Sequence, residues 1–162
     1  MSKPIKKIMV YIDGTEQSIT AAQYAICLAS FSGAELIAHY VINIKAMDDL
    51  LKARIFLQDE ELEYEHDMEA DADRYLNYVN ELAIAKGVTI IKKISRGSVS
   101  KEITDSIRSD NVDLLVVGEL SQIRSRRDEF YDETERAVRF APCSVVIVKD
   151  PEKIWDLYSS LI

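Results

Sequence analysis

Three arginines stand close together in a chain that is otherwise acidic. Arg124, Arg126 and Arg127 follow an apolar run that ends at Gly118. A guanidinium group presents a planar set of donors that matches a phosphate group. The acidic residues between Asp128 and Glu135 offer these arginines a second use, because opposite charges so close in sequence neutralise one another at a surface. The sequence thus indicates either an anion-contacting loop or a neutralised surface loop.

Asp13 is a second polar residue in a position typical of a binding site. It follows the apolar run Lys6–Ile12, which is predicted to be a buried strand, and it precedes Gly14. Ligands of open parallel sheets bind beyond the carboxyl ends of the strands. The other interpretation of Asp13 is a turn or cap residue before the glycine. Both interpretations place Asp13 at the same end of the sheet as Gly118.

The sequence contains no recognisable catalytic set. Of the two histidines, His39 lies in a predicted strand and His66 lies in a charged stretch. The motifs HExxH, G-x-S-x-G and G-x-x-x-x-G-K-[ST] are all absent from the sequence, and no Cys/His cluster is present. We therefore predict no catalytic residue and no metal site, which favours a protein that is not an enzyme.

Composition limits the class and the partners of the protein. The 162 residues suit one domain, and 48% of them are hydrophobic. A formal net charge of −8 disfavours nucleic acid and anionic membranes as partners. Cys27 and Cys143 form no CxxC motif and are interpreted as reduced thiols of a cytoplasmic protein, although the sequence leaves a disulfide open. Asp13 ends the first apolar run too early for a signal peptide, and no stretch is long enough to span a membrane.

Short apolar runs alternate with amphipathic patterns along the whole chain, which predicts an α/β fold with a parallel sheet and helices on both faces. The predicted strands are Lys6–Ile12, Ala34–Ile42, Val88–Ser95, Val112–Val117 and Ser144–Lys149. Nothing in the sequence divides the chain. We expect one domain over residues 1–162, with a core of about residues 5–149 and an extension over 150–162.

The expected helices differ in how clearly their patterns define them. The first is expected to be capped by Ser18 and to stop at Gly33. Residues 43–66 favour a short helix or an apolar loop. The other expected helices are a long one with an apolar stripe from Met68 to Ala83, a short one with Val99, Ile103 and Ile107 on its core face, one over Glu129–Phe140, and a tail with Ile154, Leu157 and Leu161 on one face.

Three stretches of the sequence resemble the universal stress protein family. They are IMVYIDGTEQSITAAQYAICLA near the start, SRGSVSKEITDSIRSDNVDLLVVG in the middle, and ERAVRFAPCSVVIV near the end. The resemblance covers nearly the whole chain and implies a Rossmann-like sheet of five strands in the order 3-2-1-4-5. It also implies a nucleotide cleft with Asp13 and Val41 at the adenosine end and Gly118 at the phosphate end.

The chain departs from the phosphate motif of nucleotide-binding members, G-x-x-G-x9-G-[ST]. Only the first glycine is present, as Gly118. Ser121 stands at the second glycine, and Tyr131 and Asp132 stand where G-[ST] belongs. A phosphate cradle needs close backbone approach and donors free of negative charge. We therefore expect no cofactor and no tight binding of ATP.

The leading hypothesis is a non-enzymatic stress-response or regulatory homodimer that acts through contacts with other proteins. Family members commonly pair through the fifth strand, so we expect Val145, Val146, Ile147 and Val148 to lie at the dimer interface. The alternative is a nucleotide-binding switch or weak ATPase of the same fold, with ATP in the Asp13, Val41 and Gly118 cleft and the arginines replacing the glycine loop.

Overall fold

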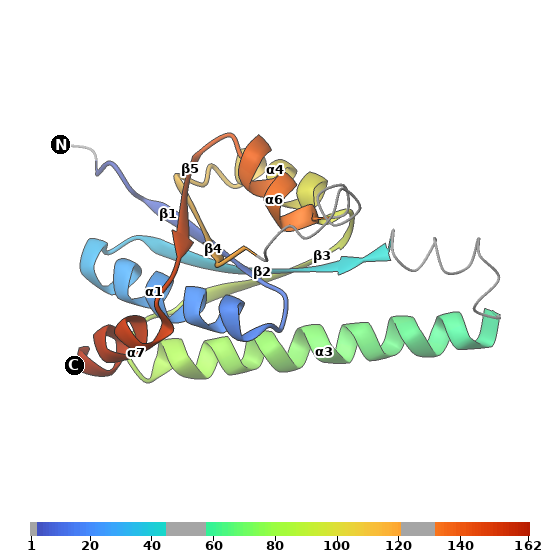
Figure 1. Cartoon of the computed structure of the whole chain (residues 1–162), viewed down its shortest axis with the longest axis horizontal. Helices are drawn as coiled ribbons and strands as arrows, with labels where there is room; N and C mark the ends of the chain where they lie inside the picture. The colour runs from blue at the N-terminus through green and yellow to red at the C-terminus, as the bar shows by residue number, and fades with distance from the viewer. Residues whose placement is uncertain (1–2, 45–57, 121–131) are drawn as a thin grey trace.

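A computed structural model describes residues 3–44, 58–120 and 132–162, and residues 58–62 and 64 by their backbone alone. Its elements are β1 (Lys7–Ile12), α1 (Glu16–Ser32), β2 (Glu35–Asn43), α3 (Gln58–Ile84), β3 (Ile90–Gly97), α4 (Val99–Ser109), β4 (Leu114–Gly118), α6 (Glu133–Phe140), β5 (Ser144–Val148) and α7 (Pro151–Ser160). The helices lie in two layers, one on either side of the sheet (Figure 1). No helix in the described ranges is both long enough and apolar enough to cross a membrane.

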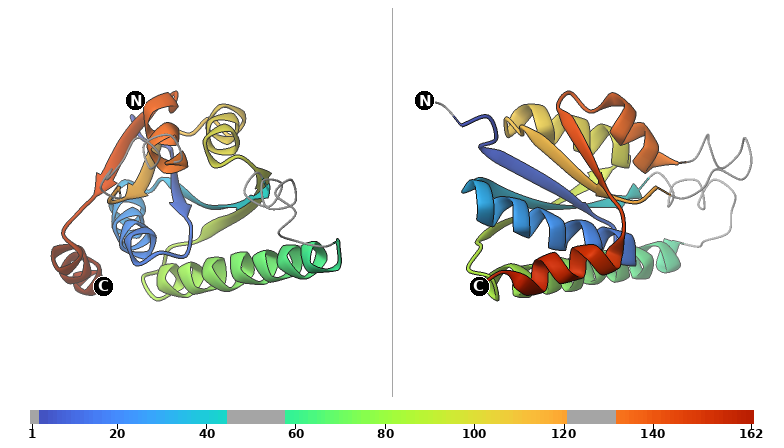
Figure 2. Two further views of the ribbon diagram at one scale, coloured as in Figure 1. Left: turned by 45° about the vertical axis from the view of Figure 1, so that its right-hand side comes forward. Right: turned by 60° about the vertical axis from the view of Figure 1, so that its left-hand side comes forward.

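The strands form one parallel sheet in the order β3-β2-β1-β4-β5, which confirms the predicted class and strand order. β1 lies in the middle, and its residues from Ile8 to Ile12 are buried. Its even-numbered side chains face α1, α3 and α7, while Met9 and Tyr11 face α4 and α6. Two turned views show these helix layers on opposite faces of the sheet (Figure 2). A strand buried on both faces reads as a continuous apolar run, which explains why β1 was predictable.

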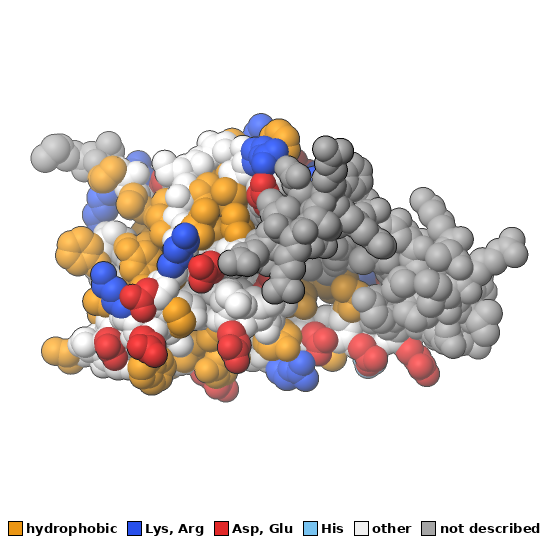
Figure 3. All heavy atoms as spheres, in the orientation of Figure 1, with side chains coloured by type: hydrophobic (Ala, Val, Ile, Leu, Met, Phe, Trp, Pro, Cys, Tyr) orange, Lys and Arg blue, Asp and Glu red, His pale blue; other side chains and the backbone are white. Residues whose placement is uncertain are grey.

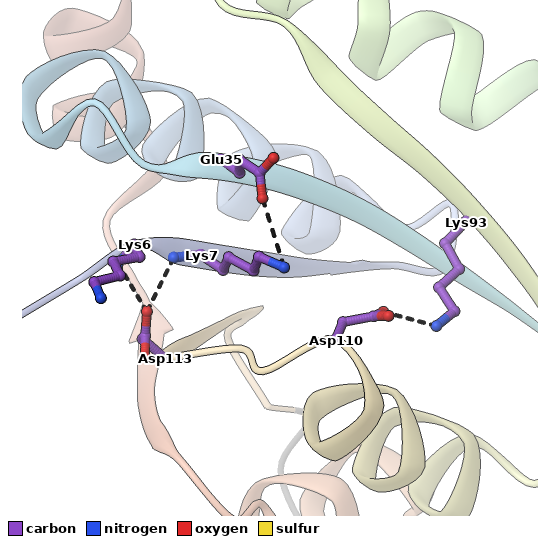
Figure 4. Close-up of polar contacts among 6 residues, drawn as sticks. All are labelled: Lys6, Lys7, Glu35, Lys93, Asp110 and Asp113. Atoms are coloured by element: carbon purple, nitrogen blue, oxygen red, sulfur yellow. Dashed lines mark hydrogen bonds and ion pairs between the residues drawn. The ribbon is translucent and has the colours of Figure 1, made fainter.

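A carboxylate fixes the amino end of the sheet. Oδ2 of Asp113, just before β4, accepts the backbone N–H of Lys6 at 2.7 Å and that of Lys7 at 3.0 Å. The N–H of Lys6, followed by that of Lys7, lowers the pKa of Asp113, because both donate to the charged form. Lys7 also reaches Glu35 on β2, so this corner holds the beginnings of three neighbouring strands together (Figure 4).

Several expected boundaries were wrong. α3 begins at Gln58, well before Met68, because its first turns carry acidic residues that give no apolar stripe. His66 therefore lies inside α3, about two turns after its first residue. The cap of α1 is Thr15, whose hydroxyl accepts the N–H of Ser18, and Ser18 itself is buried in the first turn. Asp132 caps α6, which begins at Glu133, and residues 129–131 lie outside the described residues.

α7 buries a different face from the one expected. Ile154 and Tyr158 are each 5% exposed and join the core between α1 and α3, whereas Leu157 is 43% exposed. The Tyr158 hydroxyl donates to the Leu82 carbonyl at 2.7 Å, and Nζ of Lys86 donates to the Leu161 carbonyl at 2.9 Å. These two bonds tie the end of the chain to the end of α3, so the extension is part of the core.

Gly118 ends β4 where the start of α1 crosses it. A Cβ atom at Gly118 would lie 2.5 Å from the backbone oxygen of Gln17 and 2.6 Å from its carbonyl carbon. Those backbone atoms cannot move away without shifting α1. Packing of α1 against the sheet therefore requires glycine here, whether or not the position ever meets a phosphate.

The packing of α7 predicts unequal effects for two aliphatic substitutions. Ile154→Ala removes a buried side chain and should lower the free energy of unfolding by about 2–4 kcal/mol. Leu157→Ala, on the same helix, should cost less than about 1 kcal/mol, because its side chain is already partly in water. Urea denaturation of both variants measures the difference, and equal losses would contradict the observed face.

The packing of Gly118 predicts a stability loss that is independent of any ligand. Gly118→Ala should lower the free energy of unfolding by about 1–3 kcal/mol, because the added methyl group overlaps the Gln17 backbone. Gly87→Ala is the control: nothing lies within 4 Å of its Cβ position, and its φ of +71° leaves only a conformational cost of roughly 1 kcal/mol. Thermal unfolding of both ligand-free variants compares the two, and a Gly118→Ala protein as stable as wild type would refute the packing argument.

Candidate functional site

The candidate site is a crevice at the carboxyl ends of β1 and β4, which we call the β1–β4 crevice. It has a volume of about 320 Å³. The lining residues are Tyr11, Asp13, Thr15, Gln17, Ser18, Gly118, Glu119, Leu120, Asp132 and Thr134. The crevice forms here because the chain leaves β1 toward one face of the sheet and β4 toward the other, which parts the loops above the two strands.

The structure brings three of the predicted site residues together and separates one. Asp13, Gly118 and Asp132 all line the β1–β4 crevice. Val41 is 6% exposed, packs in the core beneath α4, and is not among the crevice residues. Ser121, Tyr131 and the anion-contacting candidates Arg124, Arg126 and Arg127 lie outside the described residues.

The carboxylate of Asp13 accepts hydrogen bonds from Thr15, the N-cap residue of α1. Its Oδ1 accepts the N–H of Thr15 at 3.0 Å and the Thr15 hydroxyl at 2.6 Å. The Thr15 Oγ1 in turn accepts the N–H of Ser18 at 3.2 Å. Two backbone donors around the start of α1 are therefore satisfied by side chains of the same turn, and they are not left for an anion.

Asp132 plays the same part at the start of α6. Its Oδ1 accepts the N–H of Glu135 at 3.0 Å, so the carboxylate caps the helix. A negative charge is stabilised by the partial positive charge of a helix N-terminus. A phosphate bound at the N-terminus of α6 would compete with the Asp132 carboxylate, which already accepts the N–H of Glu135 there.

The charge of the described crevice wall is negative. Asp13, Glu119 and Asp132 supply three carboxylates, and none of the described lining residues is Lys or Arg. Tyr11 lies at the base of the wall and is 6% exposed. Burial, and then the charge of Asp13, raises the pKa of Tyr11, so its hydroxyl stays protonated. The wall thus combines hydroxyl groups with carboxylates.

A ring stack lies beside Asp13. Tyr40 of β2 and Tyr75 of α3 have ring centroids 6.3 Å apart and planes within 9°, and Arg74 lies 5.0 Å from the Tyr75 centroid. Gly14 has a φ of +84°, and a Cβ atom there would meet the Tyr75 ring at 2.5 Å. The turn after β1 therefore needs glycine for two local reasons, its φ and its neighbour.

Sequence reasoning missed seven lining residues: Tyr11, Thr15, Gln17, Ser18, Glu119, Leu120 and Thr134. Thr15 had a usable signal, because Asp-Gly-Thr before an amphipathic pattern is typical of a capped helix start. Gln17 and Thr134 had none, since their contribution depends on how α1 and α6 approach the sheet. No group of three or more His, Cys, Asp or Glu side chains with metal-binding geometry occurs in the described ranges.

Comparison with known proteins identifies the family. The model of the universal stress protein family matches residues 4–149. A universal stress protein of Methanocaldococcus jannaschii is 30% identical over 148 residues, which cover 91% of this chain and 84% of that protein. The matched region ends just before α7, so that helix lies outside the family model.

Solved structures share the fold at lower identity. A universal stress protein in complex with cAMP has a TM-score of 0.63 at 20% identity, over 90% of this chain and 97% of that one. A universal stress family protein of Arabidopsis thaliana with AMP bound has a TM-score of 0.62 at 16% identity, over 91% of this chain and 94% of that one. The match of the family model and the 30% identity to the Methanocaldococcus jannaschii protein show that the chain belongs to the universal stress protein family.

Proposed function

We propose that this chain is a non-enzymatic member of its family, acting in the cytoplasm as a homodimer that contacts other proteins and does not bind ATP tightly. The observation that carries the proposal is the β1–β4 crevice. Its described wall is acidic, and side chains already occupy donors at both helix starts that face it. A nucleotide with several phosphates would have to displace these caps and meet three carboxylates.

Electrostatics gives the scale of this penalty. Two like unit charges about 4 Å apart repel by roughly 4 kcal/mol at an effective dielectric constant of about 20. Micromolar affinity corresponds to about −8 kcal/mol and millimolar affinity to about −4 kcal/mol. One unscreened carboxylate beside a phosphate would therefore offset the difference between the two.

The remaining family glycine does not argue for phosphate binding. Gly118 is required by its contact with the backbone of Gln17. Ser121, Tyr131 and Asp132 replace the other motif residues. The only motif position that the chain retains is therefore one that the fold itself requires.

The second candidate function is a nucleotide-binding switch or weak ATPase. Two observations favour it: related structures were solved with cAMP and with AMP, and this chain has a cavity at the carboxyl ends of β1 and β4. In this alternative Asp13, Val41 and Gly118 contact the nucleotide, and Arg124, Arg126 and Arg127 supply the charge that the motif lacks.

The exposed edge of the sheet supports the homodimer. β5 is an edge strand with a neighbour on one side, β4, and three of its four apolar residues, Val145, Val146 and Ile147, are only partly covered, whereas Val148 is buried. Ile147 is 37% exposed, and Phe140, just before β5, is 63% exposed. Hydrophobic side chains gather over and beside β5 on the face seen in Figure 3. An apolar edge of this kind is a pairing hazard unless another strand covers it, and a second copy offers the same strand.

Calorimetry with ATP tests the nucleotide proposal. The unmodified protein should bind ATP no tighter than about 1 mM. Asp132→Ser keeps a capping hydroxyl but removes the charge, so it should tighten ATP binding by about tenfold or more.

Asp150→Ser is the matched control for this experiment. Asp150 caps α7 through the N–H of Lys153 at 3.3 Å and is not a crevice residue, so its replacement should leave ATP affinity unchanged. Micromolar ATP binding by the unmodified protein, or ATP retained through purification, would overturn the proposal and favour the switch.

Light scattering tests the homodimer. The protein should have twice the monomer mass at micromolar concentration, and Ile147→Asp should shift it toward the monomer, because a carboxylate cannot be buried in an apolar interface without a partner. Ile91→Asp, at 49% exposure on the opposite edge strand β3, should leave the dimer intact. A monomeric unmodified protein, or equal dissociation of both variants, would refute pairing through β5.

A further inference from the structure

His39 is a fully buried imidazole in the middle of the fold. It lies on β2, in register with Tyr11 of β1 and Lys93 of β3, and has no exposed surface. Its Nε2 lies 2.7 Å from the hydroxyl of Ser95 on β3, while its Nδ1 is buried without a hydrogen-bond partner. In the neutral ring, therefore, only Nε2 forms a hydrogen bond.

Odd-numbered side chains of β2 face the helix layer formed by α4 and α6. Ile37 and Val41, on either side of His39, pack in the cluster that contains Val99, Ile103 and Ile107 of α4. His39 therefore sits on the sheet surface that α4 covers.

The charged and titratable neighbours of His39 come from three elements. Nζ of Lys93 on β3 pairs at 2.7 Å with Oδ2 of Asp110, the residue that ends α4 (Figure 4). β1 contributes Tyr11, which burial keeps protonated. Lys93 lowers the pKa of His39 and Asp110 raises it, and Asp110 already forms an ion pair with Lys93.

Protonation changes what this site requires. An imidazolium has an N–H on both nitrogens, and the N–H on Nδ1 would point into a buried region with no acceptor. An unpaired buried charge is strongly disfavoured. Protonation of the ring therefore favours an open state in which water reaches the imidazolium. β2 cannot separate easily, because it pairs with β1 and β3 along its length. α4 is the element above the ring, and the aliphatic side chains Val99, Ile103 and Ile107 and the Lys93–Asp110 ion pair attach it to the sheet.

We propose that His39 is an acid-sensitive switch: uptake of one proton by its imidazole releases α4 from the sheet. The trigger is the proton itself, and the released helix uncovers the apolar residues Val99, Ile103 and Ile107. This inference does not depend on the proposed function, because it involves neither the crevice nor β5.

The sign and size of the effect follow from linkage. Burial, and then the charge of Lys93, lowers the pKa of His39 from 6.5 to about 4, with Asp110 opposing. Between these values the open state binds the proton and the closed state does not, so opening becomes more favourable as the pH falls. From about pH 7.5 to about pH 4.5 the opening equilibrium should rise by roughly 70-fold.

Amide hydrogen exchange measures this opening residue by residue, as protection factors corrected for the intrinsic effect of pH. In the unmodified protein the amides of Ile103 and Ile107 should lose about 70-fold of protection over that range. Those of Ala25 and Ile26 in α1, on the other face of the sheet, should lose much less.

Two substitutions distinguish the contributions of His39 and His66 to the pH dependence of α4 opening. His39→Gln cannot gain a charge and can still bond to Ser95, so the pH dependence of α4 opening should disappear. His66→Gln, at the exposed histidine of α3, should retain it. The proposal is overturned if His39→Gln opens with the same pH dependence as the unmodified protein, or if α1 and α4 lose protection together.

The unmodified protein provides a second measurement that needs no variant. Nuclear magnetic resonance follows the protonation of the His39 ring directly, with the His66 ring as the other imidazole signal. Protonation of His39 and loss of α4 protection should occur over the same pH range. Protonation of His39 while α4 remains protected would refute the switch even if His39→Gln fails to fold.

Discussion

The pairing of β1 with both β2 and β4 is the constraint on which the rest of the structure depends. It puts the first strand in the centre, buried on both faces, and forces the chain to cover one face and then the other. The crevice follows directly, since it opens where the connections from β1 and β4 part. At the opposite end of the sheet, the Asp113 carboxylate holds the first residues of β1 in place through backbone donors.

The same architecture retains its glycine and its helix caps for reasons of packing and helix stability alone. Glycine is retained where the backbone of α1 leaves no room for a side chain. The starts of α1 and α6 keep their caps, but the capping atoms come from Thr15 and from the acidic Asp132. Helix stability and phosphate binding draw on the same N–H groups, so an acidic cap supports the helix while opposing an anion.

The two faces of the sheet differ in the polarity of the side chains that they bury. The face beneath α1, α3 and α7 is apolar and is closed by the appended helix α7, whose end is fixed by Tyr158 and Lys86. The face beneath α4 and α6 includes His39, a polar group with one unsatisfied nitrogen. Apolar packing and these two hydrogen bonds stabilise the first face, whereas in our proposal the stability of the second depends on the protonation state of the His39 ring.

The sequence by itself determined the fold class, the strand order implied by the family resemblance, and the crevice positions of Asp13, Gly118 and Asp132. The fold class could be predicted from local patterns, because a buried strand and an amphipathic helix each have their own hydrophobic period. The strand order and the site positions were implied by the resemblance to the family. Only the tertiary structure decided that Val41 packs under α4, that Asp132 caps α6, that α7 buries Tyr158 and not Leu157, and that His39 has an unpaired nitrogen. Each of these depends on which distant element lies opposite a residue, and that information is not contained in local spacing.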